Sequence, residues 1–376
     1  MRREELVPRV DWPRKVEELG FHFHTFDGEV YWDERACYRF TAAQVDKLEA
    51  ATGELQSRCI DAAQRVIEKR DYARFRIPEA FHALIEQSWE DDEKSLYGRM
   101  DLAWNGDGEP KLLEYNADTP TALLEASVIQ WYWMQEVKPG ADQFNSIHEK
   151  LIERWKDMRG QLPADGRAYF SGTSESAEDQ GTLEYLRDTA MQAGIDARPI
   201  DIGDIGWDGK RFTDLDERPI NALFKLYPWE WLIREPFGQH LLGRTARVIE
   251  PPWKMLLSNK ALLPVLWEMF PDHPNLLAAS FEPGRFKSDF VKKPLYSREG
   301  ANVSINTDGR TIEEPGEYGE EGFIWQAYHP LPQIGGNHAV IGSWIVGEEP
   351  AGIGIREDDS PITKNTSRFV PHYFVP

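Results

Sequence analysis

Four polar residues in two short segments could together bind a divalent cation and a phosphate group. Arg99 and Asp101 lie two positions apart in YGRMD, and Glu114 and Asn116 lie two apart in LLEYNADTPT. Residues two apart in a strand point to the same face. Two carboxylates and an amide beside a guanidinium suit Mg²⁺, which prefers one or two carboxylates together with substrate phosphates. The alternative is an exposed charged face with an ordinary Arg–Asp pair, because most surface charge is simply solvated.

A second group of candidates lies in FVKKPLYSREGANVSI, which begins at Phe290. An apolar strand there carries Lys293 toward the loop Ser297–Gly300. Such a lysine supplies a point charge, and the N–H groups of the loop can cradle phosphate oxygens. The GxxxxGK[ST] pattern is absent, so the segment is not a P-loop. A basic hairpin turn is the alternative.

Two further basic residues stand where a ligand could approach. In SNKALLPVLWEMF, a helix is expected over Lys260–Met269. A cation at a helix start is electrostatically unusual and could meet an anionic ligand, although Lys260 could equally be a surface lysine. Arg356 follows a strand that contains glycines. A strand without side chains at these positions can be approached closely by another backbone or by a ligand.

The elements that must position these residues begin with a β-hairpin. Tyr97–Trp104 and Lys111–Tyr115 flank the turn Asn-Gly-Asp-Gly, which predicts two antiparallel strands whose polar pairs are neighbours across the ladder. The apolar residues between them are expected to form a buried opposite face: Met100, Leu102, Leu113 and Tyr115.

The rest of the chain predicts an α+β fold with mixed and antiparallel sheets and flanking helices. A strand–helix–strand unit is expected at 167–202, and strands alternating with Gly-rich turns at 322–355. Apolar periodicity predicts helices over 46–69, 123–137, 143–159 and 178–194, and strands over 167–171, 197–202, 222–227 and 289–294.

Composition excludes several classes of protein. With 64 acidic and 43 basic residues the net charge is −21, so nucleic acid is not an expected partner. The acidic balance favours cationic ligands such as polyamines, or simply maintains solubility. The two cysteines, Cys37 and Cys59, form no disulfide framework or metal cluster, and Cys59 is expected in the core. Without a signal region or a membrane-length apolar stretch, a cytoplasmic protein that does not contact a membrane is expected.

Taken together, these motifs resemble the glutathionylspermidine synthase family, especially its stand-alone acid–amine ligases. The resemblance extends from about Phe21 to the C-terminus and includes EPPWKMLLSNKALLPVLW, KKPLYSREGANV and GSWIVGEEPAGIGIRED. It implies a permuted ATP-grasp-like ligase fold, with one catalytic unit at 12–376 and a possible subdomain at 165–250. No amidase domain is expected, and so no hydrolytic half-reaction.

The resemblance also implies roles for individual residues. Two Mg²⁺ ions would be bound by Asp101, Glu114 and Asn116. ATP would be contacted by Arg99, Lys260, Lys293, Ser297, Arg298, Glu299, Gly300, Gln326, Ala327 and Tyr328. Catalytic roles are implied for Arg99, Arg298 and Arg356. Substrate contacts are implied for Thr119, Glu178 and Asp179, whereas Leu226 stands where the family places a hydroxyl.

The expected reaction is ATP-dependent formation of an amide from a small-molecule acid, peptide-like in character, and an amine, through an acyl phosphate. Such catalysis rests on positioning and electrostatic stabilisation and needs no side-chain nucleophile. Two alternatives remain open: an ATP-dependent phosphotransferase, and a non-catalytic nucleotide- or polyamine-binding protein. The identities of the two substrates and the oligomeric state are not indicated by the sequence.

Overall fold

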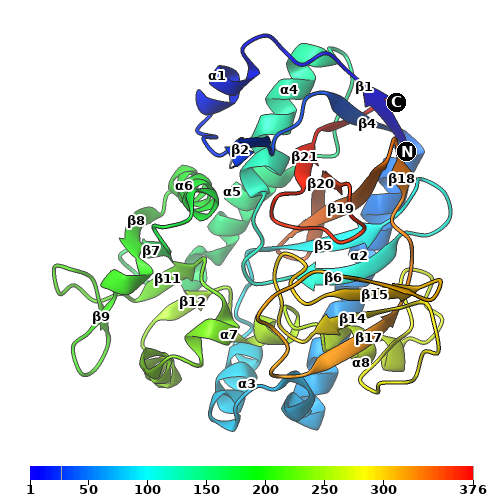
Figure 1. The fold of residues 1–376 in the computed structure, drawn as a ribbon. Coiled ribbons are helices and arrows are strands. Elements are labelled where there is room, and N and C mark those ends of the chain that lie inside the picture. Colours follow the sequence, from blue (N-terminus) through cyan, green and yellow to red (C-terminus); the bar gives the residue numbers. More distant parts are fainter. Residues whose placement is uncertain (27, 376) are drawn as a thin grey trace.

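The two ends of the chain meet in one small sheet. The computed structural model describes residues 1–26 and 28–375. β4 lies between β1, with which it is antiparallel, and β22, with which it is parallel, so the termini lie close together (Figure 1). The bounds are β1 Arg2–Glu5, β4 Ala36–Thr41 and β22 His372–Val375, and the separate hairpin is β2 Thr25–Phe26 with β3 Glu29–Val30.

A central antiparallel sheet contains the predicted hairpin. Its six strands follow the order β21-β20-β19-β5-β6, with β18 paired to β19. β5 pairs antiparallel with β6, which confirms the hairpin. The bounds are β5 Tyr97–Ala103, β6 Lys111–Asn116, β18 Gln333–Ile334, β19 Asn337–Val346, β20 Glu349–Asp358 and β21 Arg368–Val370.

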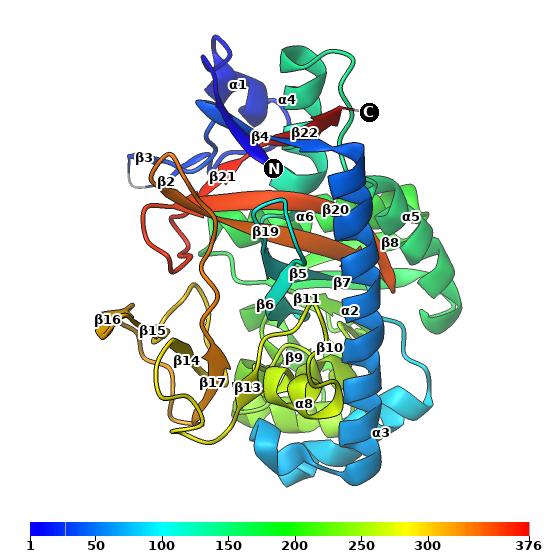
Figure 2. The ribbon, with the colours of Figure 1, turned by 90° about the vertical axis from the view of Figure 1, so that its right-hand side faces the viewer.

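The long helix α2, Ala42–Lys69, runs beside this sheet (Figure 2). It begins with a capping box, because Thr41 Oγ1 accepts from the Gln44 amide while Gln44 Oε1 accepts from the Thr41 amide. The structure confirms the helix predicted over 46–69.

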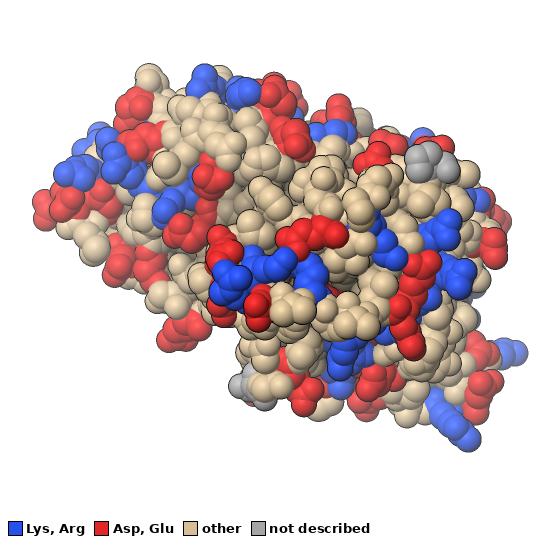
Figure 3. Space-filling model, turned by 90° about the horizontal axis from the view of Figure 1, so that it is seen from above, with Lys and Arg blue, Asp and Glu red and all other residues tan. Residues whose placement is uncertain are grey.

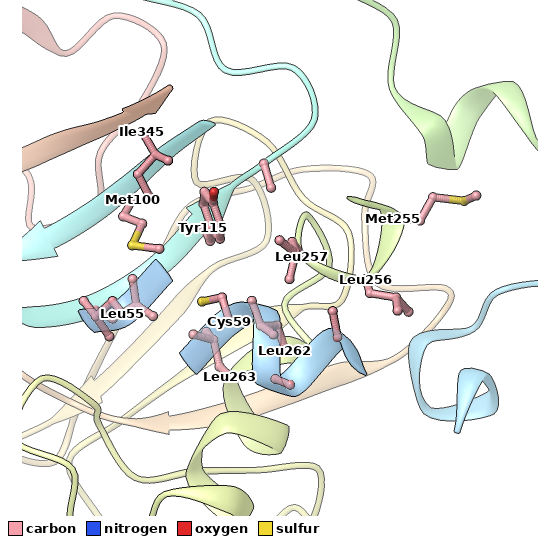
Figure 4. Close-up of a cluster of buried hydrophobic side chains, with 14 of the residues drawn as sticks. Leu55, Cys59, Met100, Tyr115, Met255, Leu256, Leu257, Leu262, Leu263 and Ile345 are labelled. Atoms are coloured by element: carbon pink, nitrogen blue, oxygen red, sulfur yellow. The ribbon is translucent and has the colours of Figure 1, made fainter. Parts of the chain in front are cut away.

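The apolar side of the hairpin packs against this helix. Cys59 of α2 is fully buried, as predicted, and belongs to one hydrophobic cluster with Met100, Tyr115 and Leu262 (Figure 4). Because this face is in the core, the polar side chains of the hairpin point the other way.

A four-stranded parallel sheet, of order β12-β11-β7-β8, forms a separate layer (green in Figure 1). β7, α6 and β8 form the predicted strand–helix–strand unit. Parallel strands end at one edge, so the segments after β7 and β11 emerge together. The bounds are β7 Arg167–Gly172, α6 Ala177–Gln192, β8 Asp196–Asp201, β11 Ala222–Lys225 and β12 Arg247–Ile249, with the small hairpin β9 Gly206–Trp207 and β10 Phe212–Thr213.

A five-stranded antiparallel sheet, of order β13-β17-β14-β15-β16, carries the second predicted segment. The strand predicted before Lys293 is confirmed as β14. The bounds are β13 Ala279–Ser280, β14 Phe290–Pro294, β15 Ser304–Thr307, β16 Arg310–Glu313 and β17 Phe323–Ala327. These sheets and their flanking helices confirm the predicted α+β class.

Three helix starts differ from prediction by more than one residue. α2 begins at Ala42 rather than at Asp46. α5 begins at Ile147 rather than at Gln143, because residues 142 and 145 form β-bridges with Phe374 and Gly352. α8 begins at Leu262, so Lys260 precedes it, in a turn.

The remaining helical elements are short. They are α1 Trp12–Glu17, η1 Tyr72–Phe75, η2 Glu79–Phe81, α3 His82–Glu90, the π-helical η3 Glu125–Ile129, α4 Gln130–Val137, α5 Ile147–Met158, η4 Arg159–Gln161, η5 Ile202–Asp204, α7 Trp229–Leu232, η6 Pro236–Gly243, η7 Pro252–Leu256 and α8 Leu262–Met269. Among the described residues, none of these helices has the length and apolar character needed to cross a bilayer.

Candidate active site

A cavity of about 570 Å³ lies where the three larger sheets approach one another. Its wall is formed by the hairpin, the start of α6, the segment after β11, the loop after β14 and the ends of β17 and β20. Every predicted site residue except Lys260 lines it: Arg99, Asp101, Glu114, Asn116, Thr119, Glu178, Asp179, Lys293, Ser297, Arg298, Glu299, Gly300, Gln326, Ala327, Tyr328 and Arg356.

The four polar residues of the hairpin form one connected group. In the ladder Arg99 is opposite Asn116, and Asp101 is opposite Glu114. Arg99 Nε donates to Asp101 Oδ1 at 2.8 Å. Asn116 Nδ2 lies 3.2 Å both from Asp101 Oδ2 and from Glu114 Oε1. The predicted convergence of the four side chains is therefore confirmed.

Two lysines from other elements face the same carboxylate. Lys260 Nζ lies 3.2 Å from Glu114 Oε2. Lys293 Nζ donates to the Leu113 carbonyl at 2.7 Å and to Gln326 Oε1 at 2.8 Å. Burial disfavours ionisation of Glu114, but the two lysines outweigh it and lower its pKa to about 2. Burial lowers the pKa of Lys293 to about 8, against the attraction of Glu114.

Leu113 corrects the expectation that all the apolar residues of the hairpin face the core. The register shifts after Asp101, so that Leu102 pairs with Leu112 and Leu113 is left over as a β-bulge. Leu113 consequently lines the cavity beside Glu114. The bulge also directs the Leu113 carbonyl to Lys293.

The hairpin donors fit Mg²⁺ by their chemistry. They supply two carboxylates and one amide, as expected for an ion completed by substrate phosphates and water. The lysines favour the anionic form of Glu114, the form that binds a cation. Within residues 1–26 and 28–375 no cluster of three or more His, Cys, Asp or Glu residues is arranged around a common metal position. An ion bound by the protein alone is therefore not indicated, whereas one shared with phosphates is compatible with this site.

The loop Ser297–Gly300 lines the cavity. Lys260 Nζ donates to the Ser297 carbonyl at 2.9 Å. Arg298 donates through Nη2 to Thr119 Oγ1, and its Nε lies 3.7 Å from Glu230 Oε1. The contacts of this loop thus reach both the segment after the hairpin and the segment after β11.

Arg356 on β20 extends the basic lining of the cavity. Its Nη2 donates to the carbonyls of Lys364 and Asn365, the latter at 2.9 Å. These two residues line the cavity as well, in the segment between β20 and β21. Gln326 and Ala327 at the end of β17, and Tyr328 just after it, also line the cavity.

The acidic pair is at the start of α6, as predicted. The Ser176 side chain caps this helix by accepting from the Asp179 amide at 3.2 Å. Burial and the neighbouring Glu178 raise the pKa of Asp179 to about 6. Glu178 Oε1 is buried and has no hydrogen-bond partner among the described residues. Leu226, just after β11, lines the cavity at 3% exposure, so it is both a core residue and a wall residue.

Sequence reasoning missed several residues at or behind this site. Trp231 lines the cavity, and Glu230 faces Arg298. Behind the wall, the fully buried Lys225 Nζ donates to Asp118 Oδ1 at 2.7 Å and so joins the hairpin side to the parallel sheet. No spacing rule could pair residues 107 positions apart in sequence.

Deeper still, Tyr31 donates to Glu125 Oε1 at 2.7 Å. Glu125 is 1% exposed, and burial together with Glu178 raises its pKa to about 7. The signal available in the sequence was a glutamate set among apolar residues near the start of the helix predicted over 123–137.

Comparison with known proteins identifies the family of the chain. The model of the family described as "Glutathionylspermidine synthase preATP-grasp" matches residues 3–375. A Haemophilus influenzae protein that is provisionally named an acid–amine ligase is 42% identical, over 98% of each chain. Trypanothione synthetase of Crithidia fasciculata is 30% identical over 84% of this chain, but only 53% of that longer protein is covered.

A solved structure resembles the fold. A glutathione synthetase-like effector of Globodera pallida matches 97% of this chain and 95% of its own, with a TM-score of 0.56 at 10% sequence identity. At that identity the likeness concerns the fold alone. The family match over nearly the whole chain goes further, and with it the chain belongs to the glutathionylspermidine synthase family of carbon–nitrogen ligases.

Proposed function

We propose that the protein is an ATP- and Mg²⁺-dependent ligase that forms an amide between a peptide-like acid and an amine through an acyl phosphate. The observation that carries this proposal is the polar face of the hairpin, where two carboxylates, an amide and Arg99 converge and two lysines face Glu114. Basic and metal-compatible groups placed together suit a polyphosphate. The fold we propose is a permuted ATP-grasp, in which 12–376 act as one catalytic unit and 165–250 form a subdomain.

The residues that would hold Mg²⁺ are Asp101, Glu114 and Asn116, with two ions expected. An ion held there would offset the negative charge of the phosphates. The side chains of Lys260 and Lys293 would meet the phosphates of ATP. The other proposed ATP contacts are Ser297, Arg298, Glu299 and Gly300 in the loop above the nucleotide and Gln326, Ala327 and Tyr328 beside the adenine.

The proposed reaction has two steps. A carboxylate oxygen of the acid attacks the terminal phosphorus of ATP, and ADP leaves. The amine then attacks the acyl carbon, the C–O bond to phosphate breaks, phosphate leaves with the electron pair, and the amine loses a proton. Arg99, Arg298 and Arg356 would stabilise charge on the moving phosphoryl group and on the tetrahedral intermediate.

The substrates are proposed from charge and position. The amine is proposed to be a polyamine, in line with the net charge of −21, although acidic and basic side chains are interspersed on the face in Figure 3 rather than separated into one acidic field. For the acid, Thr119 and the pair Glu178 and Asp179 are the proposed contacts. Leu226 stands where the family places a hydroxyl side chain. A pocket that lacks this hydrogen-bonding group should prefer a different acid, so we propose an acid substrate other than glutathione. A cytoplasmic location is part of this proposal.

The test is a panel of acids and amines assayed for ADP release, with mass spectrometry of the product. The ligase predicts that ADP release depends on both an acid and an amine. ADP release with one of the two alone would favour a phosphotransferase, and ATP binding without any turnover would favour a non-catalytic binding protein. Glutathionylspermidine as the best product would overturn the proposed departure from glutathione. If neutral amino-acid amides react better than spermidine, the proposal that the amine substrate is a polyamine is wrong.

The metal assignment has its own variant. Glu114→Gln removes one proposed ligand charge while keeping size and hydrogen bonding, so ATP turnover in Mg²⁺ should fall by roughly 100-fold or more, about 3 kcal/mol. The circular dichroism spectrum should match that of the parent. Turnover close to that of the parent would show that Glu114 is not a metal ligand.

A further inference from the structure

A second groove, separate from the cavity, lies between α1, η3, α4, α5 and α6. Its volume is about 540 Å³, in the range of small-molecule sites. Helices α5 and α6 pack against each other beneath it. The residues that line it are Leu19, Gly20, Leu124, Ser127, Val128, Trp131, Tyr132, Asn145, His148, Glu149, Gly181, Glu184, Tyr185 and Asp188.

The groove combines aromatic walls with an acidic rim. Trp131 and Tyr132 are 37% and 50% exposed, which is unusual for side chains of this size. The rim has exposed carboxylates at Glu149, Glu184 and Asp188. No lysine or arginine lines the groove among the described residues.

Two of these carboxylates are not neutralised by the protein. Glu184 forms an ion pair with Arg187 at 2.9 Å. Asp188 instead accepts from the neutral amide of Gln192 at 2.7 Å. Within residues 1–26 and 28–375, neither Glu149 nor Asp188 has an ion-pair partner. Two free negative charges therefore flank an apolar and aromatic surface.

We propose that this groove is a second binding site, for a linear aliphatic amine with two or more ammonium groups. The ammonium groups would meet Glu149 and Asp188, and the methylene chain would lie on the apolar wall. Trp131 would add a cation–π contact. These two exposed carboxylates would attract a diamine at both ends, attract a monoamine at one end, repel an anion and add nothing to the binding of a neutral ligand.

The groove is distinct from the catalytic cavity but shares an element with it. Glu178 and Asp179 line the cavity from the first turn of α6, whereas Glu184 and Asp188 line the groove further along the same helix. An amine bound in the groove would therefore lie outside the reaction site and would not be the molecule that is ligated. The proposal depends on the charges of the groove, and it stands whether or not the proposed ligase activity is confirmed.

The test is calorimetric titration of the whole protein with 1,4-diaminobutane and with butylamine, in the absence of ATP. The first variant is Glu149→Gln/Asp188→Asn. Its matched control is Asp46→Asn/Glu49→Gln, which removes two exposed charges from α2. We expect diamine affinity to fall roughly tenfold in the first variant and to stay unchanged in the control, since each exposed ion pair contributes modestly. Butylamine should bind more weakly than the diamine to the parent.

A second pair of variants separates groove from cavity. Trp131→Ala removes an exposed wall residue and should weaken diamine binding roughly fivefold. Glu178→Gln, in the cavity, should leave this binding event intact. The proposal is overturned if the groove variants and the parent bind the diamine equally, or if Glu178→Gln alone abolishes binding. Because no turnover is measured, an inactive ligase would not affect the result.

Discussion

Glu125 allows a sharp test of the buried polar network behind the active site. The side chain is 1% exposed, accepts a hydrogen bond from Tyr31, and has a pKa raised from 4.5 to about 7 by burial and by Glu178. In the unfolded chain it ionises near its ordinary value. A carboxyl group whose pKa is raised by folding destabilises the folded state once the unfolded chain ionises.

The sign and the size follow from this difference in pKa. Below pH 4.5 the group is protonated in both states and costs nothing. The cost grows as the pH rises from 4.5 to about 7 and is constant above that. At about 1.36 kcal/mol for each pH unit, the full cost is on the order of 3 kcal/mol. Glu125→Gln cannot ionise, so it should gain about 3 kcal/mol relative to the parent between pH 4.5 and pH 8.

The assay is urea unfolding of parent and variant at several values of pH between 4.5 and 8, compared as the difference in unfolding free energy. The difference cancels the titration of the groups that do not interact with Glu125. Glu49→Gln, at an exposed site, serves as the control and should stay within about 0.5 kcal/mol of the parent throughout. A difference for Glu125→Gln that is flat with pH, or that falls as the pH rises, would refute the reasoning.

Three further predictions concern the architecture of the site. A Cβ added at Gly342 would lie 2.8 Å from Arg99 Cδ, so Gly342→Ala should displace Arg99. ATP turnover should fall at least tenfold, about 1.4 kcal/mol, with little change in melting temperature. Steady-state kinetics and thermal unfolding would check this, and unchanged turnover would contradict it. Asp118→Asn leaves the buried Lys225 without its ion-pair partner. The free energy of unfolding, measured in urea, should fall by about 3 to 5 kcal/mol, and a fall of less than about 1 kcal/mol would contradict this. The loop Ser297–Gly300 should be cleaved by protease less readily with a non-hydrolysable ATP analogue than without it, as expected of a lid, and equal cleavage would count against closure over the nucleotide.

The hairpin was predictable from the sequence because its logic is local. A Gly-rich turn between two alternating segments dictates antiparallel pairing, and the two-residue period places Arg99 and Asp101 on the face shared by Glu114 and Asn116. What this period could not predict was the bulge at Leu113. An extra residue in a strand depends on the partner strand and on contacts such as that of Lys293 with the Leu113 carbonyl.

Helix starts show the same limit. The periodicity of α2 is long and regular, and its predicted end at Lys69 was confirmed, although the helix begins at Ala42, four residues before the predicted start. α5 starts later than predicted because its first expected turn pairs with strands near the C-terminus. α8 starts after Lys260, which leaves that lysine in a turn from which it reaches Glu114. The starts of α5 and α8 thus depend on contacts with segments that are distant in the sequence.

The sequence by itself determined the α+β class, the hairpin and the chemical types of the groups that the site contains, because these depend on residue type and short-range spacing. Only the tertiary structure decided which of those groups meet. Lys260 faces Glu114 and Arg298 reaches Thr119, and both contacts join segments more than 140 residues apart. The positions of such pairs depend on how three sheets pack around a shared core, and packing of that kind has no local period to be found in the chain.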